Sequence, residues 1–381
     1  MKRKNTGRYV TIDTIGEKVQ AFIPAPLPPH PVPELGDRVG NLLNRAMQAL
    51  GALDALGEHL PDVAPFIYAY IRKEAVYSSM IEGTQSSLSD LLLFEQGGYE
   101  KLDTDDVAEV SLYVSAMQKG MERMAEGYPI SLRLIRELHA ELLRRGRGSA
   151  KMPGEFRRSQ NWIGGTRPGN AAYVPPPPQA LMECLGALEL FINQTDSIPP
   201  LVKAALVHVQ FESIHPFLDG NGRVGRLLIQ MMLCHSGLLN KPLLYLSLYF
   251  KQHRGQYYKL LGGIRQDGNW EAWIEFFLQA VQHTASDAVR VLSDLQAQVN
   301  RNRETVASLG RMRRNAAKVL GIMQRHIVTR PLILAKQAGL APSTTYRILD
   351  TLEHHGIICQ SGQTERNRVY IYSAYHAMLK E

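Results

Sequence analysis

The sequence predicts a mainly α-helical protein: a helical body of about 300 residues followed by a small basic domain. Three observations support this. Apolar residues recur at helical spacing through most of the chain, and residues 314–356 have the spacing of a helix-turn-helix unit. Residues 301–381 carry 13 Lys+Arg against 5 Asp+Glu, whereas residues 1–300 carry 30 against 31. A basic module on a neutral body is typical of nucleic-acid binding, although solubility or an acidic protein partner also explains it.

The composition is that of a folded soluble protein. Of 381 residues, 45% are hydrophobic and 21% charged, which excludes collagen-like, disordered and disulfide-scaffold classes. No apolar run is long enough to span a bilayer, and the basic start is followed by prolines rather than by a signal-peptide apolar region. The three cysteines are scattered, without metal-ligand spacing. We therefore expect a cytoplasmic protein.

The first half of the chain is expected to be an arm followed by helices. Residues 1–35 are rich in proline and predict an extended arm, because proline lacks a backbone donor. Residues 36–125 have helical apolar spacing and form an N-terminal helical region. A core helix then begins after Ser131, whose hydroxyl is a suitable N-cap.

The rest of the body, residues 126–300, is interrupted by one short β element. Between Gly154 and Pro178 the short apolar pieces around a Gly/Pro/Asn turn predict a β-hairpin. Helical spacing then resumes and continues to about residue 300. Polar residues 300–314 indicate a linker or the solvated end of the last helix. The C-terminal domain is expected over 311–381.

One segment, HPFLDGNGRVGR over residues 215–226, concentrates residues with chemical potential. Its glycines have the GxGxxG spacing of dinucleotide-binding loops, but the preceding run is helical and no acidic residue follows about twenty positions on. We therefore reject a Rossmann interpretation. His208, Glu212 and His215 also lack the HExxH spacing of a zinc protease.

Local physical chemistry favours a polyphosphate site in this segment. A polar Gly-rich stretch just before a helix, which Asn221 is expected to cap, directs free N–H groups outward at the positive helix end. Arg223 and Arg226 share one face of that helix. Asp219 offers a hard oxygen ligand for Mg²⁺, and the His215 imidazole can accept a proton from an attacking hydroxyl.

The segment resembles the signature of Fic-domain proteins, HPFx[DE]GNGRxxR, at every specified position. The resemblance extends through about residue 285 and implies a helical Fic core with a β-hairpin flap. It implies transfer of AMP from ATP to a Ser, Thr or Tyr hydroxyl of a protein, with His215 as general base and Asp219 holding Mg²⁺. The residues that it implies for ATP binding in the segment are Gly220, Asn221, Gly222, Arg223, Val224, Gly225 and Arg226.

Two further parts of the chain resemble the surroundings of a Fic active site. NWIGGTRPGNAAYV is similar to the flap that pins an extended target by strand addition. Its residues expected near the nucleotide are Asn161, Trp162, Ile163 and Gly164. Tyr257 and Tyr258 are similar to positions near the adenine, although buried tyrosines are often only packed.

A third resemblance implies a built-in brake. Ser78-Ser79-Met80-Ile81-Glu82-Gly83 is similar to the family's inhibitory motif, [ST]xxxE[GN], with Ser78 and Glu82 on one helical face. By this resemblance Glu82 reaches Arg226 and occupies the place of the ATP γ-phosphate. The same carboxylate is also able to orient water for AMP removal, so a bifunctional enzyme remains an alternative.

The basic C-terminal domain resembles winged-helix domains. Two helices, a turn at residues 339–342 and a third helix capped by Ser343 precede an arginine-containing loop and an alternating strand, VYIY. The residues that this implies for DNA contact are Ser343, Thr344, Thr345, Arg347, Arg366 and Arg368. A dimerisation or target-docking module with the same fold is the opposed interpretation.

Together these features predict an ATP- and Mg²⁺-dependent protein adenylyltransferase. Its expected partners are ATP and a protein substrate, for which the chain itself is one candidate. DNA through the C-terminal domain and a second copy in a homodimer are the other expected partners. The alternative of another class is a DNA-binding regulator that uses the nucleotide site as a sensor. The resemblance disfavours a kinase-like reaction, because the divergent Fic branch with that reaction has an altered loop, whereas this chain retains Gly220 and Gly222.

Overall fold

The computed structural model describes all residues except 1–2, 4, 60–63, 96–103, 362–367 and 376–381, and it is mainly helical. The strands are β1 (Gly7–Thr14), β2 (Glu17–Pro24), β3 (Val328–Thr329), β4 (Ile358–Ser361) and β5 (Val369–Tyr372). The helices are α1 (Asp37–His59), α2 (Ala64–Ile81), α3 (Leu88–Phe94), α4 (Thr104–Ala125), α5 (Leu132–Leu142), α6 (Pro178–Asn193), α7 (Pro200–Ile214), α8 (Asn221–His235), α9 (Leu246–Gln252), α10 (Arg254–Asp267), α11 (Trp270–Ala307), α12 (Arg313–His326), α13 (Pro331–Ala338) and α14 (Pro342–His354).

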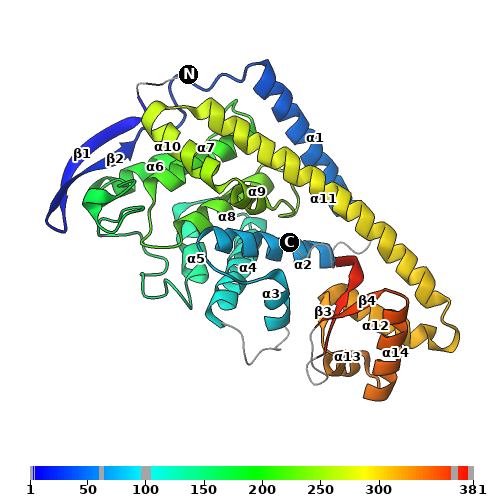
Figure 1. The fold of residues 1–381 in the computed structure, drawn as a ribbon. Coiled ribbons are helices and arrows are strands. Elements are labelled where there is room, and N and C mark those ends of the chain that lie inside the picture. The colour runs from blue at the N-terminus through cyan, green and yellow to red at the C-terminus, as the bar shows by residue number, and fades with distance from the viewer. Residues whose placement is uncertain (1–2, 4, 60–63, 96–103, 362–367, 376–381) are drawn as a thin grey trace.

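The body is helical, as the spacing of apolar residues predicts, and α8 lies within it. Helix α8 packs against α2, α4, α5 and α7, and almost all of it is buried. Helix α11 crosses the whole molecule with α1 along its side (Figure 1). Ser131 caps α5 as expected, since its hydroxyl accepts a hydrogen bond from the Leu134 N–H at 3.3 Å. Because α8 is buried among these helices, its first turn lies inside the body and is surrounded by other elements.

The N-terminal arm is not extended throughout, contrary to expectation. Strands β1 and β2 pair in register from Gly7 opposite Pro24 to Thr14 opposite Glu17. The turn between them uses left-handed backbone at Ile15 and Gly16, with φ of 51° and 74°. Prolines begin only at Pro24, so the residues before it keep the N–H groups that a ladder needs. The expectation is wrong for residues 7–24, because the prolines of the segment lie almost entirely beyond them.

The hairpin expected between Gly154 and Pro178 is reduced to a single β-bridge. Ile163 and Tyr173 exchange two backbone hydrogen bonds of 2.8 and 3.1 Å, and a 3-10 turn lies between them. Gly164 and Gly165 have positive φ, and prolines 175–178 offer no donors, so no longer ladder forms. On its other side the segment meets β2, where the Phe22 N–H donates to the Val174 carbonyl at 2.9 Å.

The C-terminal domain has the predicted helix-turn-helix with a small sheet. The strand order is β3-β5-β4, all antiparallel, beside α12, α13 and α14. No linker separates it from the body, because α11 continues to Ala307 and its Asn302 amide donates to the Tyr372 hydroxyl of β5 at 3.0 Å. Helix α12 also packs against α2. One apolar core runs from α1 into this domain.

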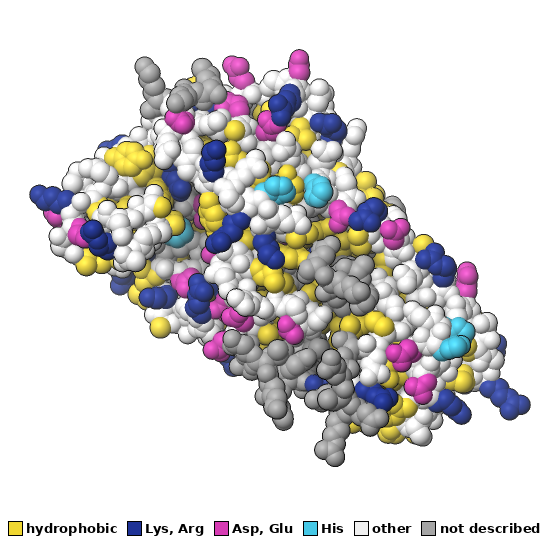
Figure 2. Space-filling view, viewed as in Figure 1, with side chains coloured by type: hydrophobic (Ala, Val, Ile, Leu, Met, Phe, Trp, Pro, Cys, Tyr) yellow, Lys and Arg dark blue, Asp and Glu magenta, His cyan; other side chains and the backbone are white. Residues whose placement is uncertain are grey.

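The surface carries charges of both signs, as the composition leads us to expect. Figure 2 shows Lys and Arg side chains interspersed with Asp and Glu on the face seen in Figure 1. No helix among the described residues is both long and apolar enough to cross a membrane. Cys184 and Cys234 are free thiols.

Candidate active site

The segment 215–226 forms a tight loop between α7 and α8. His215 follows α7 with φ of 49°, and Gly220 precedes α8 with φ of 77°, so left-handed backbone turns the chain at both ends. Asn221 does not cap α8 as predicted. Its side-chain oxygen accepts from the Phe217 N–H at 2.8 Å and its amide donates to the Phe217 carbonyl at 2.9 Å, which closes the loop on itself. Val224 is buried in the core.

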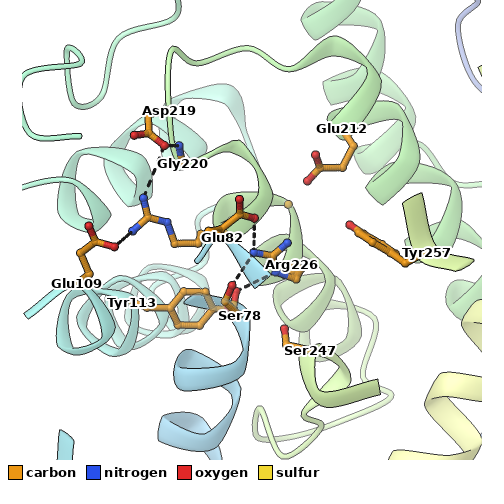
Figure 3. A network of polar contacts seen from close by, with 12 residues as sticks. Ser78, Glu82, Glu109, Tyr113, Glu212, Asp219, Gly220, Arg226, Ser247 and Tyr257 are labelled. Atoms are coloured by element: carbon orange, nitrogen blue, oxygen red, sulfur yellow. Dashed lines mark hydrogen bonds and ion pairs between the residues drawn. The ribbon is translucent and has the colours of Figure 1, made fainter. Parts of the chain in front are cut away.

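The first turn of α8 already holds an anion, the carboxylate of Glu82. Arg226 donates to Glu82 Oε1 at 2.7 Å, to Ser78 Oγ at 2.9 Å and to the Ser78 carbonyl at 2.8 Å (Figure 3). A Cβ on Gly222 would lie 2.2 Å from Glu82 Oε1, so only glycine admits the carboxylate there. Burial raises the pKa of Glu82, but the positive charges of Arg226 and Arg223 outweigh it, so the pKa lies below its usual value.

Arg223 and Arg226 are buried rather than solvated. Each is only 2% exposed. Arg223 Nη1 lies 3.2 Å from Glu109 Oε2 of α4, and its Nη2 lies 3.9 Å from Asp219 Oδ1. Burial raises the pKa of Glu109 despite the charge of Arg223. The two guanidinium groups predicted to clamp a polyphosphate are thus fixed by carboxylates from α4 and from the end of α2.

His215 is held at the mouth of the loop through its backbone. Arg157 Nε donates to the His215 carbonyl at 2.9 Å, and the Arg157 N–H donates to the Pro216 carbonyl at 2.9 Å. Burial, together with the charge of Arg157, lowers the pKa of His215 to about 4, so the imidazole is neutral near pH 7. Its Nδ1 has no hydrogen-bond partner among the described residues and lies 3.8 Å from Glu212 Oε2. A neutral imidazole in this place is able to accept a proton.

Asp219 is suited to a metal ion that arrives with its own oxygen ligands. Its Oδ1 accepts from the Gly220 N–H at 2.6 Å, whereas Oδ2 faces Gly148, where a Cβ would lie 3.0 Å away. The described residues contain no group of three or more His, Cys, Asp or Glu that could hold a metal ion. Mg²⁺ needs only one or two carboxylates when phosphates and water supply the rest. The donor set therefore fits Mg²⁺ bound to a nucleotide better than a metal held by protein alone.

The predicted flap residues lie beside the loop. The Asn161 amide donates to the Phe217 carbonyl at 3.0 Å, which ties the segment to the signature loop. Trp162 packs against the small apolar cluster at the β1–β2 hairpin. Ile163 forms the β-bridge and Gly164 begins the turn with φ of 68°. Only Asn161 of these four makes a hydrogen bond to the loop among the described residues.

The two tyrosines differ from each other in their surroundings. Tyr257 is 1% exposed, and its hydroxyl lies 2.8 Å from His208 Nε2, while His208 Nδ1 lies 3.1 Å from the Gly225 carbonyl of α8. Tyr257 thus supports α8 from within the core. Tyr258 is 42% exposed, with the Arg254 guanidinium 5.5 Å from the centre of its ring. Of the two, Tyr258 is the one exposed to solvent.

The helix-turn-helix only partly presents the expected DNA-contact residues. Ser343 and Arg347 are exposed on α14, and Thr344 is half-buried. Thr345 is fully buried and its hydroxyl donates to the Ala341 carbonyl, so its predicted exposure is wrong. Helix α14 begins at Pro342, which takes the first helical position, and Ser343 therefore is not its cap. Arg368 is half-buried, and Arg366 lies outside the described residues.

Several side chains of the site were not found from the sequence. They are Glu109, His139, Arg157, His208, and Glu212 as a neighbour of the His215 ring. Each contacts the segment from another element, and only Glu212 is close to it in sequence. A carboxylate three residues before His215 is the one local signal that was available.

Comparison with protein families identifies three parts of the chain. Residues 129–233 match the Fic/DOC family, residues 41–122 match the Fic/DOC family N-terminal region, and residues 329–362 match the IclR helix-turn-helix domain. The last match agrees with the winged helix-turn-helix expected from the sequence.

Individual proteins point to the same family. The protein adenylyltransferase Fic of Drosophila grimshawi is 30% identical over 265 residues, which is 67% of this chain and 50% of the relative. That of Drosophila mojavensis is 34% identical over 172 residues, or 45% of this chain and 31% of the relative. The chain spans about half the length, or less, of these curated relatives.

Solved structures share the fold. A Fic family protein from Desulfovibrio desulfuricans superposes with a TM-score of 0.58 at 19% identity and covers 89% of this chain and 97% of its own. A Fic domain containing signaling protein from Bacteroides thetaiotaomicron has a TM-score of 0.55 at 19% identity and covers 66% and 97%. The chain therefore carries a Fic/DOC domain over residues 129–233, with the intact signature, and the Fic/DOC family N-terminal region over residues 41–122.

Proposed function

We propose that this chain transfers AMP from ATP to a Ser, Thr or Tyr hydroxyl of a protein and releases pyrophosphate. The observation that carries the proposal is the Glu82 carboxylate seated on Arg226 at the N-terminus of α8. A carboxylate that is held by a buried guanidinium and lies close to Gly222 in the first turn of a helix occupies a site suited to a phosphate. The names of the relatives, protein adenylyltransferase Fic, agree with a nucleotide at this place.

The residues of the loop supply the parts that such a transfer requires. His215 takes the proton of the acceptor hydroxyl while the hydroxyl oxygen bonds to the α-phosphorus of ATP. At the same time the bond between the α-phosphorus and the oxygen that bridges it to the β-phosphate breaks. The backbone at Gly220 and Gly222 and the two buried arginines stabilise the charge on the phosphates. Asp219 would hold Mg²⁺, which when bound neutralises phosphate charge and assists the departure of pyrophosphate.

The same geometry supports a role for Glu82 as an internal inhibitor. Because its carboxylate occupies Arg226, ATP binds productively only when the end of α2 withdraws. Holding the competent state near 1% requires about 2.7 kcal/mol, half of the full shift between 1:99 and 99:1. One charge-assisted hydrogen bond contributes about 1.5 to 3 kcal/mol. A single carboxylate is therefore sufficient.

The experiment compares ATP labelled at the α-phosphate with ATP labelled at the γ-phosphate, using the full chain with Glu82→Gly and candidate protein acceptors, including the chain itself. Label is expected in protein only from the α-position. His215→Ala in the same background should reduce labelling about 10²- to 10⁴-fold. Label arriving from the γ-position would indicate a kinase. ATP binding without transfer from either position would favour a nucleotide sensor.

The C-terminal domain supports a second function, DNA binding. The specific observation is the IclR helix-turn-helix match together with exposed Ser343 and Arg347 on α14. In this fold the second helix of the motif enters the major groove. Binding to duplex DNA that weakens steeply with salt would support it, and absence of binding at low salt would contradict it.

A further inference from the structure

One buried histidine outside every sequence motif touches the signature loop at two points. His139 of α5 is 0% exposed. Its ring stacks on Phe217 with the ring centres 3.7 Å apart and the planes 7° from parallel. Its Nε2 lies 3.0 Å from the backbone carbonyl of Asp219, and its Nδ1 lies 2.8 Å from the N–H of Gly154. The ring therefore links the loop to the base of the flap segment.

The two hydrogen bonds define the form of the ring. The Gly154 N–H is able only to donate, so His139 Nδ1 must carry a lone pair. The Asp219 carbonyl is able only to accept, so Nε2 must carry the proton. Only the neutral imidazole protonated at Nε2 satisfies both partners. With both nitrogens engaged, His139 is itself neither a metal ligand nor a general base in this arrangement.

The bond to Asp219 orients the residue that is expected to hold the metal. The Asp219 carbonyl receives this hydrogen bond. Among the described residues, the Asp219 carboxylate accepts a hydrogen bond only from the adjacent Gly220 N–H and lies 3.9 Å from Arg223. Fixing the carbonyl fixes the peptide plane between Asp219 and Gly220. The N–H of that same plane donates to Asp219 Oδ1, so the plane also constrains the direction of the carboxylate. Outer groups of this kind commonly alter metal affinity 10- to 100-fold.

The other bond prevents the ring itself from turning. Gly154 follows the α5 region and leads to Arg157, whose guanidinium donates to the carbonyls of His215 and Pro176. A Cβ on Gly154 would lie 3.0 Å from that of Ala140, so the N–H approaches α5 closely. Nδ1 of His139 is thus fixed to a segment that, through Arg157, also holds the His215 end of the signature loop.

We propose that His139 is a positioning residue that aims the Asp219 carboxylate at the metal of the bound nucleotide. This inference rests on the proposed function, because it assumes a nucleotide–metal complex in the loop. It assigns no chemistry to His139 itself. It predicts that losing the N–H at Nε2 of His139 weakens metal binding even in a variant that remains folded.

The test uses the matched pair His139→Gln and His139→Asn in full chain carrying Glu82→Gly. A glutamine amide reaches the position of Nε2 and is able to donate to the Asp219 carbonyl, whereas an asparagine ends near Nδ1 and serves only Gly154. The probe is Mn²⁺ with ADP, measured by electron paramagnetic resonance, with Asp219→Ala as the reference for lost metal binding. His139→Asn should weaken Mn²⁺ binding about 10-fold or more, and His139→Gln less than about 3-fold.

Three results separate positioning from a structural role. Equal weakening in both variants, or none in His139→Asn, would overturn the inference. So would Mn²⁺–ADP binding in the parent that does not depend on Asp219. If His139→Asn does not fold, nitrogen-15 spectra of the unaltered chain decide, because protonation at Nδ1 instead of Nε2 contradicts the inference.

The proposed function fails separately. A parent that binds Mn²⁺–ADP through Asp219 but transfers no AMP refutes the transferase and leaves the role of His139 intact. Adenylyl transfer that is unaffected by His139→Asn at limiting Mg²⁺ refutes the positioning role and leaves the transferase intact.

Discussion

Two groups of arginines in this chain are used in opposite ways. Arg223 and Arg226 of α8 are 2% exposed, and each meets a carboxylate from a distant element. Arg313, Arg314 and Arg347 of the C-terminal domain are exposed. A buried guanidinium must be paired and is therefore fixed in place for a specific ligand, whereas an exposed one acts through long-range, salt-screened attraction.

The comparison also explains what each group revealed in the sequence. The buried pair was recognised by its spacing within twelve residues. Of the exposed group, Arg347 was indicated by its place in the helix-turn-helix, and Arg313 and Arg314 only by counting charge. Spacing identifies a chemical role because the helix fixes the relative positions of the side chains. A charge count identifies a property of a surface and leaves the ligand open.

The largest effect is expected from removing the partner of Arg226. Glu82→Gly should raise AMP transfer about 100-fold, since it releases a state populated near 1%. Initial rates under saturating ATP and Mg²⁺ measure this. Glu82→Gln is the matched control, because it keeps the shape and a hydrogen-bond acceptor but removes the charge, and we expect an intermediate rise. An unchanged rate in both variants would refute the internal inhibitor.

The next prediction applies the same substitution to one arginine of each group. Arg226→Lys should destabilise the fold by about 2 kcal/mol, because lysine cannot reproduce the Nε and Nη2 contacts to Ser78 and Glu82. Arg347→Lys should stay within about 0.5 kcal/mol, since the exposed charge is retained. Urea denaturation midpoints compare the two. Equal losses would mean that burial does not distinguish the two groups.

A smaller effect concerns the carboxylate on the far side of Arg226. Burial raises the pKa of Glu212 to about 7, against the charge of Arg226. The folded state binds the Glu212 proton more tightly than the unfolded state does. The free energy of unfolding therefore falls as pH rises above the unfolded pKa of Glu212, and it stops falling once Glu212 is fully ionised in the folded state, above pH 7. Between pH 6 and 8 the loss is about 1 kcal/mol. Glu212→Gln cannot ionise.

The measurement is the difference in unfolding free energy between Glu212→Gln and the parent at pH 6 and pH 8. Buried His139 and His208, whose pKa values burial lowers to about 4 and about 3, contribute equally to both proteins and cancel. The variant should gain about 1 kcal/mol relative to the parent over this interval. A difference that does not change with pH would contradict a proton-binding Glu212 in the folded state.

The sequence predicted the helical architecture and the signature loop because both depend on local patterns. Helical spacing indicated the body, and twelve adjacent residues carried the loop chemistry. It did not reveal Glu109 or His139, which reach the loop from 114 and 80 residues away. Pairings of this kind depend on how helices pack, which no local spacing encodes.

The errors have the same origin. Thr345 occupies a position in α14 that the motif alone suggested was exposed, yet α14 turns it into the core. The β1–β2 hairpin was missed because proline content was averaged over a segment whose first half contains none. In both cases a property of a whole segment does not hold for every residue within it: the orientation of Thr345 differs in one, and the class of element over residues 7–24 differs in the other.

The smallest effect is expected on the exposed arginines and DNA. If the C-terminal domain binds a duplex, Arg347→Ala should weaken binding about threefold and lower the slope of log affinity against log salt by about 1, because one fewer counterion is released. Fluorescence anisotropy over a salt series measures both quantities. Ser343→Ala is the matched control on the same exposed turn of α14 and should leave the slope unchanged, since it carries no charge. A fall in affinity for Arg347→Ala with no change of slope would mean that this arginine reads a base edge rather than a phosphate, and would make the exposed group as specific as the buried one.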